Sequence, residues 1–305
     1  MTTAEYACKT RTNARSPLTS AVLLSKPGIL TLTVLAGFTG MVMATGGLPD
    51  GRTCLPCLLS MLMAAAGSAM INGVLDASLD MRMQRVRARV EAMAELGRTR
   101  VAFIAVGLIG ISTVISLFYL NFLATVLILA AALGYIFPYT LWLKRWSPFG
   151  VVPGGIPGAL PVLIGAAAVL QNVRPDCLIL FFILLLWQPP HFWILALKYR
   201  DDYQAAGVPV MPVVMGMQYT KVMIFIYVVA LMPASLMLGL LGYCSVWCAA
   251  FVFLSGVLFA AACYRFVIKS PHFDRAFSAS IWYLALLFLA IITDICLIRP
   301  SFPAG

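Results

Sequence analysis

The sequence predicts an all-α, polytopic membrane protein in which nine transmembrane helices form a bundle around a central cavity. Three observations lead to this fold class. Hydrophobic residues make up 62% of the 305 residues and charged residues only 10%, which excludes an ordinary soluble domain. The apolar residues gather in segments of about 20 residues, the length that crosses a bilayer as a helix. Lysine and arginine collect in every second loop, as membrane topology requires.

Nine apolar segments follow one another, and each can satisfy its own backbone hydrogen bonds as a membrane-spanning helix. They cover residues 28–46, 55–74, 101–119, 122–139, 150–170, 177–197, 222–241, 245–264 and 278–298. Residues 28–298 are therefore expected to form one transmembrane domain, with an N-terminal tail at 1–27 and a C-terminal tail at 299–305. An odd number of spans places the two tails on opposite sides of the membrane.

The basic residues orient this bundle. Eighteen of the 21 lysines and arginines lie in the N-terminal tail or in loops after even-numbered segments; the others are Arg52, Arg174 and Arg299. This bias predicts a cytoplasmic N-terminus and an outer C-terminus, in the inner (plasma) membrane of a bacterial cell. Topology thus accounts for the formal net charge of +10, and no nucleic-acid partner is expected. The tail at 1–27 lacks the apolar core of a signal peptide; a transit peptide is the alternative to a plain cytoplasmic tail.

A polar motif stands at the cytoplasmic end of the second segment. Asn72, Asp76 and Asp80 are spaced by four, so a helix would place them on one face. Two carboxylates and an amide oxygen suit Mg²⁺ shared with substrate phosphates. Acids at membrane depth are costly and are functional candidates by default.

Five arginines follow this motif and suit phosphate groups. They are Arg82, Arg85, Arg87, Arg89 and Arg98. The alternative is that they only mark the cytoplasmic side, which explains most of the arginines but not the acids on one face.

The sixth segment carries a second acidic group at the same side. Asp202 is a further candidate metal ligand, whereas Asp201 can simply pair with a neighbouring basic residue. Pro189-Pro190 inside the segment should kink the helix and leave carbonyls for a neighbour or a cavity. His191 would share a face with Asp202, about 16 Å deeper, if the helix were continuous. A hydrogen bond to a neighbouring helix and a ligand pocket are both open for His191.

The fourth and fifth segments meet at the same cytoplasmic end. Lys144 and Arg145 end the fourth, where they serve as topology markers or as ligands for a diphosphate. The fifth opens with prolines every four residues, and Gly154 and Gly158 have the spacing of a close-packing pair. A thin, bent helix would leave room for a bulky ligand, and simple helix packing is the equal alternative.

Six of the eight cysteines lie on or near the outer side. They are Cys54, Cys57, Cys177, Cys244, Cys248 and Cys296. Buried apolar thiols are the favoured interpretation, and an outer-face disulfide is the alternative hypothesis.

From Lys26-Pro27 to Asp294, these motifs together resemble the UbiA-type intramembrane prenyltransferases, and among them the protoheme IX farnesyltransferase (heme O synthase) branch. The superfamily motif appears as Asn72, Asp76, Asp80, Met83 and Arg85. The branch motifs appear as Tyr139-Thr140, Leu143-Lys144-Arg145, Ser147-Pro148 and Gly154-Gly155, and as Trp187-Gln188-Pro189-Pro190-His191-Phe192-Trp193 running on to Asp202-Tyr203, Ala206-Gly207-Val208-Pro209 and Met211-Pro212.

The chain departs from the family pattern at two places. The usual D-R-D-x-D reads Asp76-Ala77-Ser78-Leu79-Asp80, and the usual R-T-x-x-R-P reads Arg85-Val86-Arg87-Ala88-Arg89-Val90. The outer acids remain, so the departures affect the geometry of the loop rather than the core chemistry. Ala206 also stands four residues after Asp202, where relatives with aromatic acceptors carry a second acid, and this favours the heme branch.

The resemblance implies transfer of a farnesyl group from farnesyl diphosphate to a vinyl group of heme b, with addition of water, to give heme O for terminal oxidase assembly. It implies Mg²⁺ as cofactor on Asn72, Asp76, Asp80 and Asp202, with the three acids as catalytic residues. Arg85, Arg89, Lys144 and Arg145 would bind the diphosphate. His191 and Trp187 would line the heme pocket, and a downstream heme-modifying enzyme or an oxidase is the implied partner.

Two alternatives stay open at this point. Prenyl transfer to another ring acceptor is the first. The second is a secondary transporter for an anion or a metal, which would also carry buried acids and broken helices. A transporter site belongs near the middle of the bilayer, whereas these acids stand at helix ends beside arginines.

Overall fold

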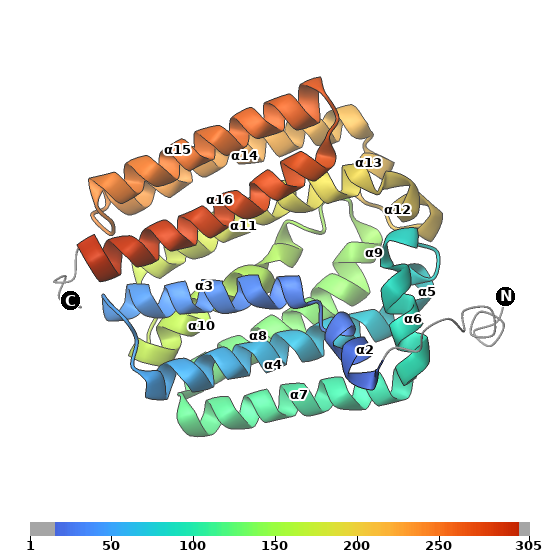
Figure 1. Ribbon diagram of the computed structural model, residues 1–305, viewed down its shortest axis with the longest axis horizontal. Coiled ribbons are helices and arrows are strands. Elements are labelled where there is room, and N and C mark those ends of the chain that lie inside the picture. The colour runs from blue at the N-terminus through green and yellow to red at the C-terminus, as the bar shows by residue number, and fades with distance from the viewer. Residues whose placement is uncertain (1–15, 299–305) are drawn as a thin grey trace.

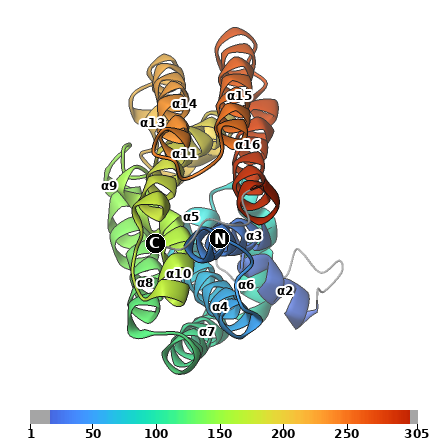
Figure 2. The same ribbon diagram turned by 90° about the vertical axis from the view of Figure 1, so that its left-hand side faces the viewer.

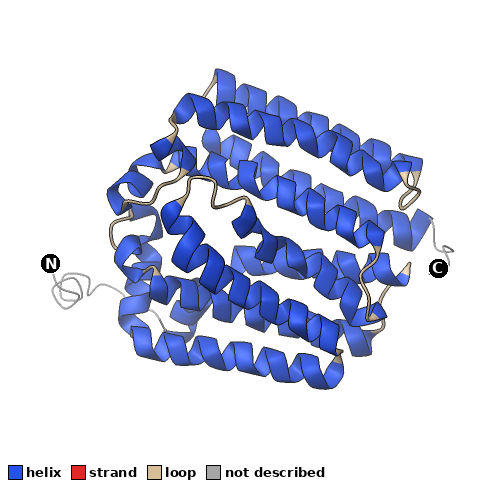
Figure 3. Ribbon diagram, turned by 180° about the vertical axis from the view of Figure 1, so that it is seen from behind, coloured by secondary structure: helices blue, strands red, loops and turns tan. Residues whose placement is uncertain are grey.

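The computed structural model describes residues 16–298. Within that range every regular element is helical (Figure 3). Nine helices there are long and apolar enough to cross a membrane: Pro27–Thr45, Gly51–Leu75, Arg98–Tyr119, Phe122–Trp146, Pro153–Leu170, Pro175–Lys198, Met217–Leu240, Val246–Lys269 and Phe273–Ile298. The nine expected spans are thereby confirmed, and most of the helices extend a few residues beyond the apolar segments.

Several spans are assembled from more than one helical piece. The long pieces are α3 (Pro27–Thr45), α4 (Gly51–Leu75), α7 (Arg98–Tyr119), α8 (Phe122–Gly134), α10 (Ile156–Leu170), α11 (Pro175–Lys198), α14 (Met217–Leu240), α15 (Val246–Cys263) and α16 (Phe273–Thr293). The spans of α8, α15 and α16 continue as π-helices η2 (Tyr135–Leu143), η4 (Tyr264–Lys269) and η5 (Asp294–Ile298), and the 3₁₀ turn η3 (Pro153–Gly155) precedes α10.

The short elements gather at one end of the bundle (Figure 1). They are α2 (Pro17–Leu24), α5 (Ala77–Asp80), η1 (Gln84–Val86), α6 (Arg87–Leu96), α9 (Lys144–Trp146), α12 (Arg200–Ala206) and α13 (Met211–Val214). The loops after the even-numbered spans, which hold most basic residues, lie at this end. We call it the basic end.

Helix α2 was not expected, because residues 1–27 read as a tail. The Ser16 hydroxyl caps its first turn by accepting a hydrogen bond from Thr19 N at 3.2 Å. Ser20 donates to Glu95 of α6 at 2.6 Å, and Leu24 is buried in a cluster with Met93. Helix α2 is therefore fixed against α6.

Seen end-on, the helices form two groups (Figure 2). Helices α3, α4, α7, α8 and α10 pack together, and α11, α14, α15 and α16 form the second group, which contacts the first through α10–α11 and α3–α16. Glycines bring α3 and α10 together: a Cβ at Gly40 would lie 2.1 Å from Val162 O, and one at Gly165 would lie 2.0 Å from Gly37 O. Only glycine permits this backbone approach.

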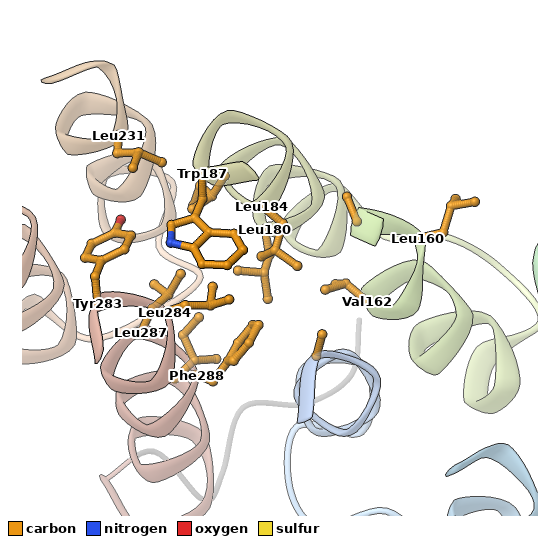
Figure 4. Close-up of a cluster of buried hydrophobic side chains, with 14 of the residues drawn as sticks. Leu160, Val162, Leu180, Leu184, Trp187, Leu231, Tyr283, Leu284, Leu287 and Phe288 are labelled. Carbon is orange, nitrogen blue, oxygen red and sulfur yellow. The ribbon is translucent and has the colours of Figure 1, made fainter. Parts of the chain in front are cut away.

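The outer surface is apolar, as a bilayer requires. Phe103 and Phe118 of α7 and Trp247 of α15 are largely exposed, which in water would be an aggregation liability. Inside, Leu184 and Trp187 of α11 face Leu284 and Phe288 of α16 across the core (Figure 4). Cys54, Cys57, Cys177 and Cys296, four of the outer-side cysteines, are free thiols, so the structure does not support an outer-face disulfide at these positions.

Candidate active site

A cavity of about 960 Å³ runs from the basic end into the bundle between the two helix groups. Its volume lies near the upper end of the range of about 300–1,000 Å³ that is usual for ligand sites. Asn72, Asp80 and Lys144 line it at the basic end, and Met61 of α4 lines it farther in. Asn72 and Met61 are eleven residues apart on α4, about 16 Å along the helix. The cavity therefore has a charged end and an apolar depth.

The Asn72–Asp76–Asp80 motif does not form one uninterrupted helix. Helix α4 ends at Leu75, because Asp76 leaves the helical region with φ −92° and ψ 3°, and α5 restarts at Ala77. The Asn72 amide donates to Asp76 Oδ2 at 2.9 Å and to Thr140 Oγ1 at 3.0 Å. The expected neighbourhood of Asn72 and Asp76 is thus present, but the break turns Asp76 and Asp80 toward different surroundings.

Asp76 is buried behind the cavity wall, with 1% of its surface exposed. Lys144 Nζ forms an ion pair with Asp76 Oδ2, and Arg145 Nη2 lies 3.2 Å from Asp76 Oδ1. Arg145 also donates from Nε to Thr140 O at 3.2 Å. The structure therefore holds Lys144 against Asp76 at the cavity and keeps Arg145 outside the cavity lining.

Asp80 lines the cavity directly. Its carboxylate makes no hydrogen bond or ion pair with the residues of range 16–298. Burial raises the pKa of the Asp80 carboxyl above its ordinary value, and the positive charges of Lys144 and Arg89 oppose that rise. A half-buried carboxylate without a partner is the group at this end that is free to take a cation.

Asp202 connects the segment after α11 to the segment after α5. Its Oδ2 accepts a hydrogen bond from the backbone N–H of Arg85 at 2.8 Å. Arg85 in turn donates from Nη2 to Tyr203 OH at 3.2 Å, and its guanidinium lies 5.2 Å from the Tyr199 ring centre. The expectation that both acidic groups meet at one end is fulfilled, but Asp202 itself does not line the cavity.

His191 and Asp202 would share a face only on a continuous helix, and the helix between them is interrupted. Helix α11 ends at Lys198 and α12 starts at Arg200, because Tyr199 takes φ −111° and ψ 33°. The Pro189-Pro190 pair, by contrast, lies within the α-helical range of α11. The break falls after Lys198, where the chain turns to bring Asp202 and Tyr203 onto the loop that carries Arg85.

Lys26 also lines the cavity, although its position in the sequence indicates only the cytoplasmic side of the membrane. It precedes Pro27 with φ +59°, an unusual conformation for a residue other than glycine. Its Nζ donates to Asn72 Oδ1 at 2.5 Å and to Tyr135 OH at 3.3 Å. Burial, followed by the charge of Arg89, lowers the pKa of Lys26 to about 8. This ammonium is buried against neutral acceptors.

The charged end of the cavity carries an excess of positive charge. Four cations line it within the described range, and Asp80 is the one carboxylate among them; the cations are Lys26, Arg85, Arg89 and Lys144. Burial lowers the pKa of Arg89 from its ordinary high value. Such an excess of buried positive charge is stabilised by an anion with several charges.

The π-helix η2 shapes one side of this end. Thr140 Oγ1 donates to Tyr135 O, five residues back, at 2.8 Å, and π-segments of this kind are frequent at functional sites. Tyr135 and Tyr139 stack with ring centres 5.5 Å apart, and both line the cavity.

Two glycines of the fifth span lie against cavity side chains. A Cβ at Gly154 would lie 2.3 Å from the Tyr139 ring, and one at Gly158 would lie 2.5 Å from Gln188 Oε1. These glycines therefore make room for cavity side chains rather than for a helix backbone.

Trp187 and His191 line the inner part of the cavity. Trp187 donates from Nε1 to Ser280 O at 2.8 Å, and His191 Nδ1 lies 2.7 Å from Ser280 Oγ. Ser280, on α16, had no signal in the sequence, because a serine in an apolar helix usually bonds only to its own backbone. The hydrogen bond to a neighbouring helix and the cavity-lining position, which stood as alternatives for His191, are both present.

A comparison with protein families matches residues 30–292 to the UbiA prenyltransferase family. A protoheme IX farnesyltransferase from Geotalea uraniireducens is 51% identical over 256 residues, which cover 84% of this chain and 99% of the relative. A protoheme IX farnesyltransferase 1 from Chromobacterium violaceum is 36% identical over 273 residues, covering 89% and 91% of the two chains.

Solved structures share the fold at much lower identity. A UbiA homolog from Archaeoglobus fulgidus, bound to DMAPP and Mg²⁺, superimposes with a TM-score of 0.68 at 13% identity and covers 90% of this chain and 99% of its own. A structure described as digeranylgeranylglyceryl phosphate synthase in membranes gives a TM-score of 0.72 at 19% identity, covering 92% and 99%.

Proposed function

Since this chain belongs to the UbiA prenyltransferase family, we propose that it transfers a farnesyl group from farnesyl diphosphate to a vinyl group of heme b, with addition of water, to give heme O. The assignment of a diphosphate as the donor substrate rests on the charged end of the cavity, which has four cations and one unpaired carboxylate. The heme acceptor is supported by the relatives named protoheme IX farnesyltransferase. A transporter does not account for this family membership.

We propose that Asn72 and Asp80 would hold the metal at this end. Asp76 and Asp202, which the motifs also suggested as ligands, would instead hold Lys144 and the backbone of Arg85 in place. Asn72 and Asp80 line the cavity, and no group of three acidic, histidine or cysteine side chains within residues 16–298 could hold a metal alone. Mg²⁺ commonly binds through one or two carboxylates together with substrate phosphates. One carboxylate and one amide oxygen, from Asp80 and Asn72, are consistent with this kind of site. When bound, Mg²⁺ would neutralise the diphosphate and make it a better leaving group.

The remaining side chains then have separate tasks. Lys26, Arg85, Arg89 and Lys144 would bind the oxygens of the diphosphate and stabilise the charge that develops as the C–O bond to farnesyl breaks. Arg145 would act from behind, by holding Asp76. The apolar inner wall, with Met61, Leu284 and Phe288, would bind the farnesyl chain and keep water from the allylic carbon. Trp187 and His191 would contact the porphyrin.

We place the chain, a multi-pass membrane protein, in a bacterial inner membrane with its basic end in the cytoplasm. Cytoplasmic farnesyl diphosphate would then meet the charged end of the cavity directly. Heme O is a precursor rather than an end product, so an enzyme that modifies heme further, or an oxidase, is the proposed downstream partner.

The test of the proposed function is a transfer assay with the purified protein. We expect heme b, farnesyl diphosphate and Mg²⁺ to yield a porphyrin whose mass has increased by one farnesyl group and one hydroxyl group. We expect EDTA to stop the reaction and added Mg²⁺ to restore it. An unchanged porphyrin mass with active controls for both substrates would contradict the assignment.

Lys26 provides a separate prediction about the diphosphate. The variant Lys26→Met is expected to raise the KM for farnesyl diphosphate by about tenfold, because it removes one buried charge-assisted contact. The KM for heme b should not change. Steady-state kinetics with each substrate varied in turn measure both values.

Arg87→Met is the matched control for Lys26→Met, since Arg87 is exposed, pairs with Glu91 at 3.2 Å and does not line the cavity. Equal rises in both KM values in Lys26→Met would mean that Lys26 supports the cavity as a whole rather than the diphosphate.

A further inference from the structure

The imidazole of His191 is held between two aromatic rings. Its ring centre lies 4.4 Å from that of Trp187, with 21° between the planes, and 4.5 Å from that of Phe277, with 29° between the planes. Both faces of the imidazole are therefore covered, one from α11 and the other from α16. Only the edge of the ring can meet a molecule in the cavity that His191 lines.

The hydrogen bonds of Ser280 fix the tautomer of His191. A serine hydroxyl has one proton to donate, and Ser280 Oγ donates it to Phe277 O at 2.6 Å. With that proton given to Phe277 O, we assign the contact of 2.7 Å between Ser280 Oγ and His191 Nδ1 as a hydrogen bond that Nδ1 donates. The proton of the neutral imidazole is consequently on Nδ1, and Nε2 carries a lone pair.

The second ring nitrogen is left for a ligand. Nε2 makes no hydrogen bond within the described range, and it is not among the buried polar atoms that lack a partner there, so it opens on the cavity. An imidazole whose Nδ1–H is held by a fixed acceptor and whose Nε2 is bare has the form in which histidine binds metals. A histidine with a purely structural role would not need Nε2 on the cavity side.

We propose that Nε2 of His191 is an axial ligand to the iron of heme b when the acceptor binds, and that Ser280 is the residue that positions it. This inference rests on the proposed function, which supplies heme as the acceptor. The coordinate bond forms from the lone pair of Nε2 to iron, and no proton or electron is transferred. A porphyrin held in this way lies across the edges of the Trp187, His191 and Phe277 rings, so the ligand bond sets how far its vinyl groups stand from the charged end.

The test uses the purified full-length protein without farnesyl diphosphate, so that binding is separated from transfer. Heme b and metal-free protoporphyrin IX are titrated in turn, with absorption spectra as the readout. We expect His191→Gly to weaken heme b binding by at least about tenfold and to lose the histidine-ligated spectrum. Binding of metal-free protoporphyrin IX should not change, because that molecule has no iron. Added imidazole should restore the spectrum of His191→Gly.

Two further variants complete the design. His272→Gly removes the other histidine, which is exposed at the basic end, and it should behave like the parent protein. Ser280→Ala keeps the imidazole but removes the acceptor for Nδ1–H, and we expect a loss of heme b affinity of about tenfold with unchanged binding of metal-free protoporphyrin IX. That unchanged binding also shows that the pocket of each variant has kept its shape.

Two other outcomes would contradict the iron ligation, and each identifies which part of the proposal is wrong. Equal loss of both porphyrins in His191→Gly, or an unchanged heme spectrum in that variant, would overturn iron ligation while leaving heme as the acceptor. If the parent protein bound neither porphyrin, the heme acceptor itself would be wrong, and the ligation would be wrong with it.

Discussion

Replacement of Asp80 by asparagine is expected to lower the rate of farnesyl transfer by about 1,000-fold or more. Asp80 is the one carboxylate among the described residues that line the cavity, and it has no ion-pair partner there. The amide is isosteric but carries no charge, so the site loses the group that would attract the metal of the diphosphate. A loss of this size is about 4 kcal/mol of transition-state stabilisation.

The measurement is the initial rate of formation of the farnesylated porphyrin at saturating substrates. The matched control is Asp201→Asn, because Asp201 is exposed and lies next to Asp202 outside the cavity. The melting temperature of Asp80→Asn should not fall below that of the parent protein, since the carboxylate makes no contact that would be lost and burial already disfavours its charge. Full activity of Asp80→Asn would remove Asp80 from the reaction.

Replacement of Asp76 by asparagine is expected to remove activity and stability together. The Asp76 carboxylate is 1% exposed and pairs with Lys144 and Arg145. Removing one partner of a buried ion pair leaves the other uncompensated, at a cost of about 3 kcal/mol. In a chain of 305 residues that cost lowers the melting temperature by roughly 5 °C. The displaced Lys144 should also bind the diphosphate less well.

Thermal unfolding in detergent and the transfer assay together distinguish Asp76 from Asp80. A double variant, Asp76→Asn with Lys144→Met, serves as the control, because it removes both charges and should recover part of the lost stability. A melting temperature of Asp76→Asn equal to that of the parent would contradict a structural role for this ion pair. It would then favour direct exposure of Asp76 to the ligand.

The spans could be predicted from the sequence because length and hydrophobicity alone decide whether a helix crosses a bilayer. Helix α2 could not, since eight residues with mixed polarity give no such signal and the helix depends on contacts with α6. The four-residue spacing correctly predicted that Asn72 and Asp76 touch. It could not predict that the backbone breaks at Asp76, which decides that Asp80 rather than Asp76 faces the cavity.

Lys26 and Ser280 could not be predicted as site residues, because their partners lie far away along the chain. Lys26 looks like any basic residue beside a span, and only its left-handed backbone brings the ammonium to Asn72, 46 residues away. Ser280 reaches His191 across 89 residues of chain. The lost middle acid and arginine of the family motif leave Ala77 and Ser78 in α5, and Arg85 and Arg89 still line the cavity.

The contact between Asp202 and Arg85 has a consequence for how the protein is made. The two residues are 117 positions apart, so during synthesis the charged pocket stays half-built until the sixth span has left the ribosome and entered the bilayer. The imidazole of His191 waits still longer, since Ser280 belongs to the ninth span. Insertion of the chain would therefore complete the proposed diphosphate site first and the proposed heme site last. A polypeptide that stalls between these two stages would have the cations for the diphosphate but no positioned histidine for the iron.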